Sequence, residues 1–296
     1  VRGRADRFRE PIRALAVTQW AMGALAIATL TAYLASFNWM AFLIQGLDQN
    51  AEGYALFTAS KYGIALAVMI PATFCAGITL PLITRILIVS GGGEKAIGAV
   101  YSVNTLGSIV GAGLAALVLM PVLGLKTLLI AGGVIDMALG VWLMFLAGRN
   151  SEQTRKFAIS LVGATVIVIM GGYLNANFDK GILTSGVFRY GTAPKPGERN
   201  RGIVFYRDGR TATVSVRKSE DGSYSIATNG KPDASLSAPW FDTDTSTRAT
   251  SRLDGDESTQ VLLPLTTLAH VPNAEDRKST RLNSSHIPLS RMPSSA

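Results

Sequence analysis

Few side chains in this sequence are suited to chemistry, and their scarcity limits what the protein can do. The chain contains a single cysteine, Cys75, and only two histidines. This is too few for the Cys/His ligand sets of zinc sites, and one cysteine cannot build a disulfide framework. Asp136 stands out because it is the only carboxylate deep inside a long apolar stretch. A buried acid of this kind would bind a cation or relay a proton, or it would instead stay protonated or pair with Lys61.

Long apolar segments must position these residues. The mean hydropathy of the chain is +0.29 and only 16% of its residues are charged, which is low for a soluble protein. Glycine and proline inside the apolar segments are compatible with membrane helices. We therefore expect an α-helical membrane bundle of about five spans, each near the ~20 residues that cross a bilayer core. The five stretches are residues 14–36, 56–86, 97–123, 125–147 and 157–174.

Lysine and arginine residues near the spans predict their orientation. A basic segment, residues 1–13, precedes the first span, and further basic residues follow the second and fourth spans. The opposite loops carry Asp48 and Glu52, and then only Lys126. The N-terminus is therefore expected in the cytoplasm. Five spans would leave the polar module that follows outside the cytoplasm, unless residues 56–86, which two prolines interrupt, do not span. The side of this module stays open.

One apolar stretch also carries small residues at helical spacing. Gly107 and Gly111, continued by Ala115, would let another helix approach closely. Glycine scattered in an apolar helix explains the same pattern. A helix–helix oligomer is one expectation from this ridge.

From about residue 202 the pattern changes to short alternating segments separated by turns. Residues 176–201 are rich in Gly and Pro and are predicted to be a linker that leaves the membrane. Asp-Gly and Asn-Gly pairs between alternating runs are strong hairpin signals. We interpret Asp208 and Gly209 as turn residues without a chemical role. The expected sheet is a three-stranded antiparallel meander over residues 203–207, 210–217 and 224–228.

Several segments resemble the start of the spermidine synthase (aminopropyltransferase) domain. They are VFYRDGRTATVSV, SIATNGKPDAS and DESTQVLLPLTTLAHVPNAE. More narrowly, the chain is similar to bacterial membrane proteins in which a transporter-like helical region is fused to such a domain. The segments GITLPLITR, AVYSVNTLGSIVGAGLAALVLMPVLGL and TSGVFRY carry that likeness, which covers residues 64 to 275. It implies a location in the bacterial inner (plasma) membrane.

The resemblance implies that the sheet is the lid of a Rossmann-like α/β domain. That domain binds decarboxylated S-adenosylmethionine, or S-adenosylmethionine in related enzymes, together with a small amine. A neutral amine attacks the carbon beside the sulfonium, and an aspartate accepts the proton of the amine. The Gly-rich turn that would hold the nucleoside is expected just after Glu275. Residues 276–296 instead read, codon by codon, like a sequencing adapter, so we expect a non-native tail and a fragment that is inactive without its core.

That tail contributes three of the eight net positive charges. Many of the remaining Lys and Arg side chains flank the apolar stretches, where they meet anionic lipid. The composition therefore predicts a lipid bilayer as partner and no nucleic acid.

The resemblance also identifies three candidate substrate-binding residues, Asp256, Glu257 and Gln260. In the soluble enzymes the Asp-Glu pair is followed, after two residues, by a Tyr-His pair that lines the diamine site. Gln260 and Val261 occupy those places here, and an apolar Val cannot hydrogen-bond an amine, which weakens the case for a polyamine. Gln260 would contact a ligand through its amide, or cap a helix that opens near Val261. Asp256 and Glu257 would attract a cationic substrate or favour a helix dipole.

Two classes of function are compatible with these observations. The first is a membrane-bound enzyme of the aminopropyltransferase or methyltransferase type. The second is a transporter or binding protein for a small cationic solute with a regulatory soluble module, and a purely scaffolding module is a third reading. The expected organisation is a cytoplasmic segment (1–13), a membrane region (14–175), a linker (176–201), the start of a spermidine synthase-like domain (202–275) and the tail (276–296).

Overall fold

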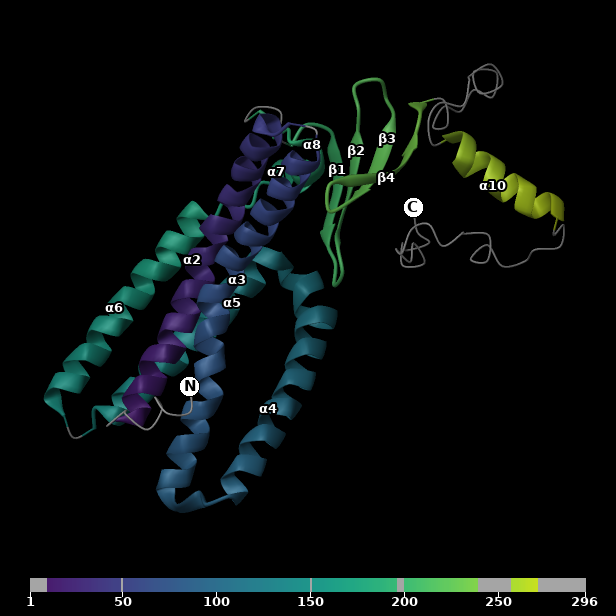
Figure 1. Cartoon of the computed structure of the whole chain (residues 1–296). Helices are drawn as coiled ribbons and strands as arrows, with labels where there is room; N and C mark the ends of the chain where they lie inside the picture. Colours follow the sequence, from purple (N-terminus) through teal and green to yellow (C-terminus); the bar gives the residue numbers. More distant parts are fainter. Residues whose placement is uncertain (1–9, 49, 150, 196–199, 239–256, 271–296) are drawn as a thin grey trace.

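The computed structural model describes residues 10–48, 50–149, 151–195, 200–238 and 257–270. It consists of a bundle of long helices with a small antiparallel sheet at one end (Figure 1). Most of the segment 1–13, the tail 276–296 and Asp256 lie outside the described residues.

Within the described residues, four helices are long and apolar enough to cross a membrane, with lengths of 36, 42, 53 and 24 residues. This confirms the expected helical, membrane-type region. The helices are α2 (Pro11–Gly46), α3 (Ala51–Leu87) with the π-helical turn η1 (Ile88–Gly92), α4 (Lys95–Leu114) joined through η2 (Ala115–Leu119) to α5 (Met120–Ala147), and α6 (Glu152–Asn175).

The third of these helices is interrupted at Gly124. Its backbone torsions there are φ 73° and ψ 170°, which a residue with a Cβ rarely adopts. An unbroken helix of this length would extend about 80 Å, far beyond a bilayer core of ~30 Å. The two arms, residues 95–123 and 125–147, match the expected third and fourth stretches. The described chain therefore runs along the bundle five times.

Proline does not interrupt the second helix. α3 runs through Pro71 and Pro81 without a break, and Asn50 caps its first turn by accepting a 2.7 Å hydrogen bond from the backbone N–H of Gly53. Membrane helices tolerate proline when the freed backbone groups find other partners. The prolines are therefore compatible with residues 56–86 as a membrane span.

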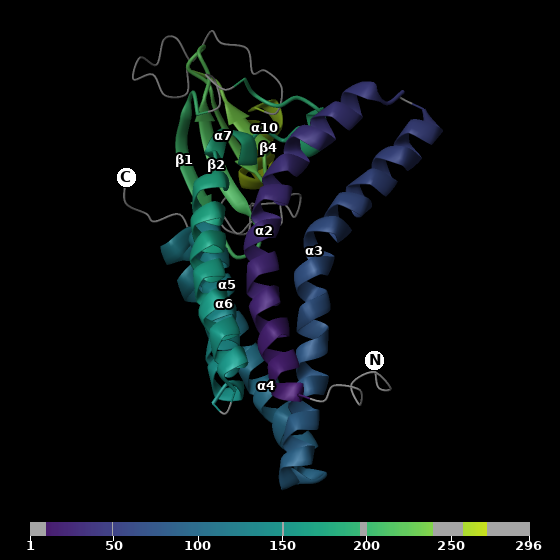
Figure 2. The same cartoon turned by 90° about the vertical axis from the view of Figure 1, so that its left-hand side faces the viewer.

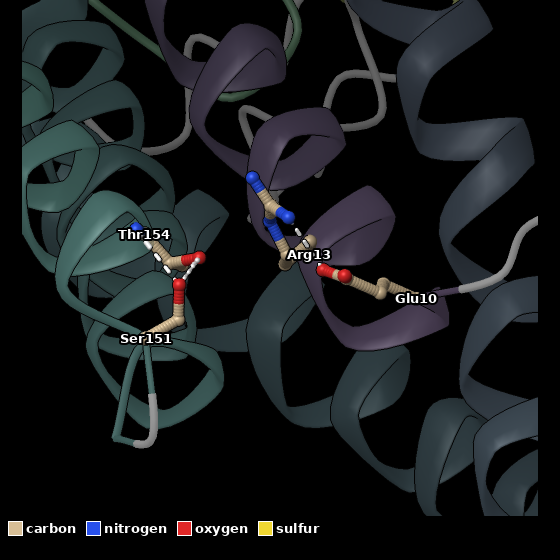
Figure 3. Close-up of polar contacts among 4 residues, drawn as sticks. All are labelled: Glu10, Arg13, Ser151 and Thr154. Carbon is tan, nitrogen blue, oxygen red and sulfur yellow. Dashed lines mark hydrogen bonds and ion pairs between the residues drawn. The ribbon is translucent and has the colours of Figure 1, made fainter.

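Local contacts at the opposite end of the bundle from the sheet mark where two helices begin. Ser151 Oγ accepts hydrogen bonds from the N–H of Thr154 (3.4 Å) and from its hydroxyl (3.2 Å), which caps α6 (Figure 3). At the start of α2, Arg13 Nη1 lies 2.6 Å from Glu10 Oε2 (Figure 3). These polar groups end the apolar part of the bundle on this side.

Helix α2 lies at the centre of the bundle and packs against α3, α5 and α6 (Figure 2). Its contact with α5 is close because Gly23 lies against the backbone of Gly133, where a Cβ would collide. In contrast, a Cβ on Gly107 or Gly111 of α4 would meet nothing within 4 Å. The ridge expected on α4 therefore packs on no described helix, and its role in an oligomer stays a prediction.

The sheet has four strands, one more than the meander expected from the sequence. Their order is β1-β2-β3-β4, and all neighbours are antiparallel. The missed strand contains Pro232, a residue type that is rare inside sheets, although the Asn-Gly pair before it is a hairpin signal. The strands are β1 (Ile203–Asp208), β2 (Thr213–Lys218), β3 (Tyr224–Thr228) and β4 (Lys231–Leu236).

The expected linker also differs from the prediction, because part of it is ordered against the bundle. Two short helices, α7 (Lys180–Leu183) and α8 (Val187–Tyr190), lie within residues 176–201. Val187 is completely buried in a cluster with Phe37, Met40 and Ala41 of α2. Apolar side chains in a glycine-rich segment thus attach the sheet to the bundle. After the sheet comes α10 (Glu257–His270), which contacts β4.

Candidate functional site

Gln260 lies in the first turn of α10, beside the β4 edge of the sheet. α10 begins at Glu257 and not near Val261, so the predicted helix start was a few residues too late. The Gln260 Nε2 atom is buried and has no hydrogen-bond partner among the described residues. A buried amide donor without a hydrogen-bond partner is energetically costly. The Nε2 atom can therefore donate a hydrogen bond to an acceptor of a ligand. Neither Asp256 nor the side chain of Glu257 lies within the described part of the chain.

Asp136 faces α2 within the bundle. Its Oδ1 accepts a 2.7 Å hydrogen bond from Nε2 of Gln19. Lys61, which the sequence offered as an alternative partner, instead lies over the rings of Phe57 and Tyr62, at 5.6 and 5.3 Å from their centroids. The expected pairing with Lys61 is therefore wrong, because the two residues lie on different neighbours of α2. No cluster of three or more His, Cys, Asp or Glu residues suited to a metal occurs in the described ranges.

A third candidate site lies where the bundle meets the sheet. A cavity of about 160 Å³ lies there between α2, the α5 residue after the break at Gly124, the α7–α8 segment and the sheet. We call it the junction cavity. Half of its lining residues are aromatic, and the full lining comprises Tyr33, Phe37, Leu125, Leu183, Phe188, Tyr206, Thr213 and Asn229.

Asp208, at the end of β1, connects three of these lining residues. Its Oδ1 accepts hydrogen bonds from the Tyr206 hydroxyl and from Thr213 Oγ1, both at 2.8 Å. Its Oδ2 accepts from the backbone N–H of Leu125 at 3.3 Å, directly after the break at Gly124. The carboxylate therefore joins both strands of the hairpin to the point at which the chain turns from α4 into α5.

The environment of Asp208 changes the chemistry of Tyr206. Burial raises the pKa of the Tyr206 phenol, and the hydrogen bond to the Asp208 carboxylate, together with its negative charge, raises this pKa further. The phenol thus stays a hydrogen-bond donor well above neutral pH. The Nζ atom of Lys180 lies 5.4 Å from the centroid of the Tyr206 ring.

Two close backbone contacts hold the walls of the cavity together. Gly186 has φ 65° and Gly230, in the β3–β4 turn, has φ 78°, and each would bring a Cβ into the backbone of the other. Gln45 Nε2, near the end of α2, donates a 2.8 Å hydrogen bond to the carbonyl of Gly191. The sheet and the bundle are therefore in direct contact and are not separated by a free linker.

Sequence reasoning missed the junction cavity because Asp208 was interpreted as a turn residue only. One signal was present. Tyr206 and Asp208 are two residues apart in a strand, so their side chains lie on the same face. Antiparallel pairing then places Thr213 directly opposite Asp208. Nothing in the sequence connected this group to Leu125, which is 83 positions away.

Comparison of the chain with protein-family models, with curated proteins and with solved structures gives no match.

Proposed function

We propose that this chain attaches a spermidine synthase-like module to a membrane, with the sheet β1–β4 as its lid and Gln260 in the substrate cleft. The observation that carries the proposal is the buried Nε2 atom of Gln260, which has no partner among the described residues. A substrate oxygen or other acceptor next to α10 would satisfy it. The segments that resemble the aminopropyltransferase family are the same ones that form β1–β4 and α10.

The chemistry of such a module assigns limited roles to this chain. Decarboxylated S-adenosylmethionine would supply an aminopropyl group on a sulfonium, to be transferred to an amine. The lid would keep water from the cleft, and Gln260 would orient the acceptor through its amide. Residues that hold the nucleoside and accept the proton would belong to the Rossmann-like part of such a module.

The test uses the whole protein, purified into lipid nanodiscs. Binding of decarboxylated S-adenosylmethionine, S-adenosylmethionine and putrescine is measured by calorimetry for the parent and for Gln260→Ala. Loss of the amide should weaken ligand binding by roughly 1–3 kcal/mol, because the group that it pairs with stays buried. Thr266→Ala, an exposed position on the same helix, is the matched control and should bind like the parent.

Two results would contradict this proposal. Equal binding by the parent and by Gln260→Ala would remove Gln260 from the site. A parent that binds none of the three compounds would remove the enzyme reading itself.

A second candidate function, handling of a small cation by the bundle, is favoured by where the sheet lies. The described chain runs along the bundle five times, so the sheet is at the opposite end from the loop at Arg149 and from the start of α4 at Lys95. Basic residues mark the cytoplasmic side. An extracytoplasmic sheet would have little access to a nucleoside cosubstrate, and Asp136 with Gln19 would then be the polar group that a cation meets. Transport assays of Asp136→Asn in proteoliposomes test this candidate.

A further inference from the structure

We propose that the junction cavity binds a small organic ammonium group, carried either by a free ammonium compound such as choline or by a phospholipid headgroup. This inference concerns the β1 edge of the sheet, whereas Gln260 belongs to the β4 edge. It does not require aminopropyltransferase activity.

The walls of the cavity supply aromatic rings from three separate elements. Tyr33 and Phe37 come from α2, Phe188 from α8 and Tyr206 from β1. The ring centroids of Tyr33 and Phe37 are 5.4 Å apart, and those of Phe37 and Phe188 are 5.2 Å apart, both in edge-to-face arrangements. The face of an aromatic ring carries partial negative charge and attracts alkylammonium ions, more strongly where water is excluded. Rings around a small cavity are therefore suited to an organic cation.

The charge beside these rings has the sign that an ammonium group needs. Asp208 accepts hydrogen bonds from Tyr206, Thr213 and Leu125, all of which line the cavity. These three donors are uncharged groups. Among the described residues, Asp208 forms no ion pair. Asp208 is not itself a lining residue, so a cation in the cavity would be attracted by a negative charge that lies directly behind Tyr206, Thr213 and Leu125.

The ring of Tyr206 lies next to one cation of the protein itself. The Nζ atom of Lys180, which is not a lining residue of the cavity, is 5.4 Å from the centroid of that ring. Lys180 is exposed and comes from the short helix α7. A tethered cation next to the same ring competes electrostatically with a bound one. The removal of its charge should therefore strengthen binding.

The cavity is open to a ligand from the aqueous side. Asn229, at its rim, is exposed and lies in the turn between β3 and β4. Its Oδ1 accepts a hydrogen bond from the N–H of Thr213 at 2.9 Å, so the rim is ordered. A volume of about 160 Å³ accommodates a trimethylammonium group but not a nucleoside. The size of the cavity thus selects a small head group.

The experiment titrates the full chain, in nanodiscs of phosphatidylglycerol only, with choline and with 3,3-dimethylbutan-1-ol. The alcohol has the shape of choline without its charge. We expect choline to bind about tenfold or more tightly than the alcohol, because only the cation gains from the rings and the carboxylate. Equal binding of the two compounds, or no binding of choline, would overturn the proposal.

Three variants test which residues form the site. Asp208→Asn, which keeps one acceptor oxygen but loses the charge, should weaken choline binding about tenfold. Lys180→Gln should tighten it, and this exposed residue remains informative if Asp208→Asn does not fold. Asp221→Asn, in the exposed β2–β3 turn, is the matched control and should change nothing. If neither Asp208→Asn nor Lys180→Gln changes the affinity for choline, this cavity is excluded as the site.

A second set of nanodiscs distinguishes the two sources of the ammonium group. If a lipid headgroup is the natural ligand, phosphatidylcholine discs should reduce binding of added choline to the parent and should not do so for variants that have lost the site. If a free ammonium compound is the ligand, choline should bind equally in both kinds of disc. These outcomes do not depend on the proposed site at Gln260. They would be the same if Gln260→Ala did not change the binding of decarboxylated S-adenosylmethionine, S-adenosylmethionine or putrescine.

Discussion

The backbone N–H of Leu125 donates a hydrogen bond to Oδ2 of Asp208, across 3.3 Å, at the point where the membrane-type helices meet the sheet. Leu125 directly follows the break at Gly124, and Asp208 ends β1. A break in a helix frees backbone groups that need partners. In this protein one of those groups is satisfied by the sheet, so the position of the hairpin and the path of the chain from α4 to α5 depend on each other.

Replacement of Asp208 by Ala should detach the hairpin from the bundle. It leaves the Leu125 N–H and the hydroxyls of Tyr206 and Thr213 without their acceptor, at a cost of roughly 1–3 kcal/mol for each group that stays buried. Limited proteolysis in detergent should cut the β1–β2 hairpin faster than in the parent. Asp221→Ala is the control, since its partner Ser223 lies in the same exposed turn. Equal cleavage of Asp208→Ala and parent would show that this carboxylate does not hold the hairpin.

Replacement of Gly230 by Ala should disturb the contact between the sheet and α8. Gly230 has φ 78°, and an added Cβ would collide with the backbone of Gly186. A strained backbone at such a position costs on the order of 1–3 kcal/mol. The midpoint of chemical denaturation, followed by tryptophan fluorescence, should decrease. Gly163→Ala in α6, where a Cβ meets open space, should leave that midpoint unchanged or raise it.

Stability should fall at alkaline pH through Tyr206. The pKa of this phenol is raised in the folded protein above its usual 10.0. A raised pKa contributes stability that is fully present below about pH 10 and is lost as the pH rises toward the folded value. Tyr206→Phe should therefore show a smaller loss of stability above pH 10 than the parent. If the two curves fall in parallel, while Tyr224→Phe behaves like the parent, the phenol is not coupled to folding.

Cysteine labelling should place the sheet and the α2–α3 loop on one side of the membrane. In a Cys75→Ser background, Asp48→Cys and Glu220→Cys should react with the same side-selective reagent, and Ser151→Cys only with the opposite one. The reason is the number of passes, because α6 returns the chain to the end where α2 finishes. If Ser151→Cys and Glu220→Cys are labelled from the same side, α6 does not cross the membrane and the five-pass topology is wrong.

Loss of the partner of Asp136 should destabilise the bundle. Gln19→Leu leaves the carboxyl group of Asp136 without its hydrogen bond, and the expected cost is about 1–3 kcal/mol. The double variant Gln19→Leu/Asp136→Leu should recover much of the loss, because no polar group is then left unpaired. Thermal unfolding in detergent measures both. An additive effect of the two changes would mean that the hydrogen bond contributes nothing to stability.

The sequence by itself determined the elements whose signals are local. Apolar length predicted the helices, including a boundary between residues 123 and 125. The structure has this boundary at Gly124, whose backbone torsions glycine adopts more easily than other residues. Period-two alternation and the Asp-Gly turn predicted β1 to β3, since alternation places one face of each strand on the same side. The missed strand β4 starts with Lys231 and Pro232, whose residue types are poor in strands.

Only the tertiary structure decided which distant groups meet. Asp136 pairs with Gln19 and not with Lys61, since α2 and not α3 packs against that face of α5. Residues 176–201 look like a polar linker, yet Val187 is buried because the bundle offers Phe37 and Met40 as neighbours. In the sequence Asp208 has only the features of a turn aspartate, and its contact with Leu125 is seen only in the structure. Contacts across 83 or 117 positions depend on how helices and strands pack, and that packing leaves no signal in the spacing of residues along the chain.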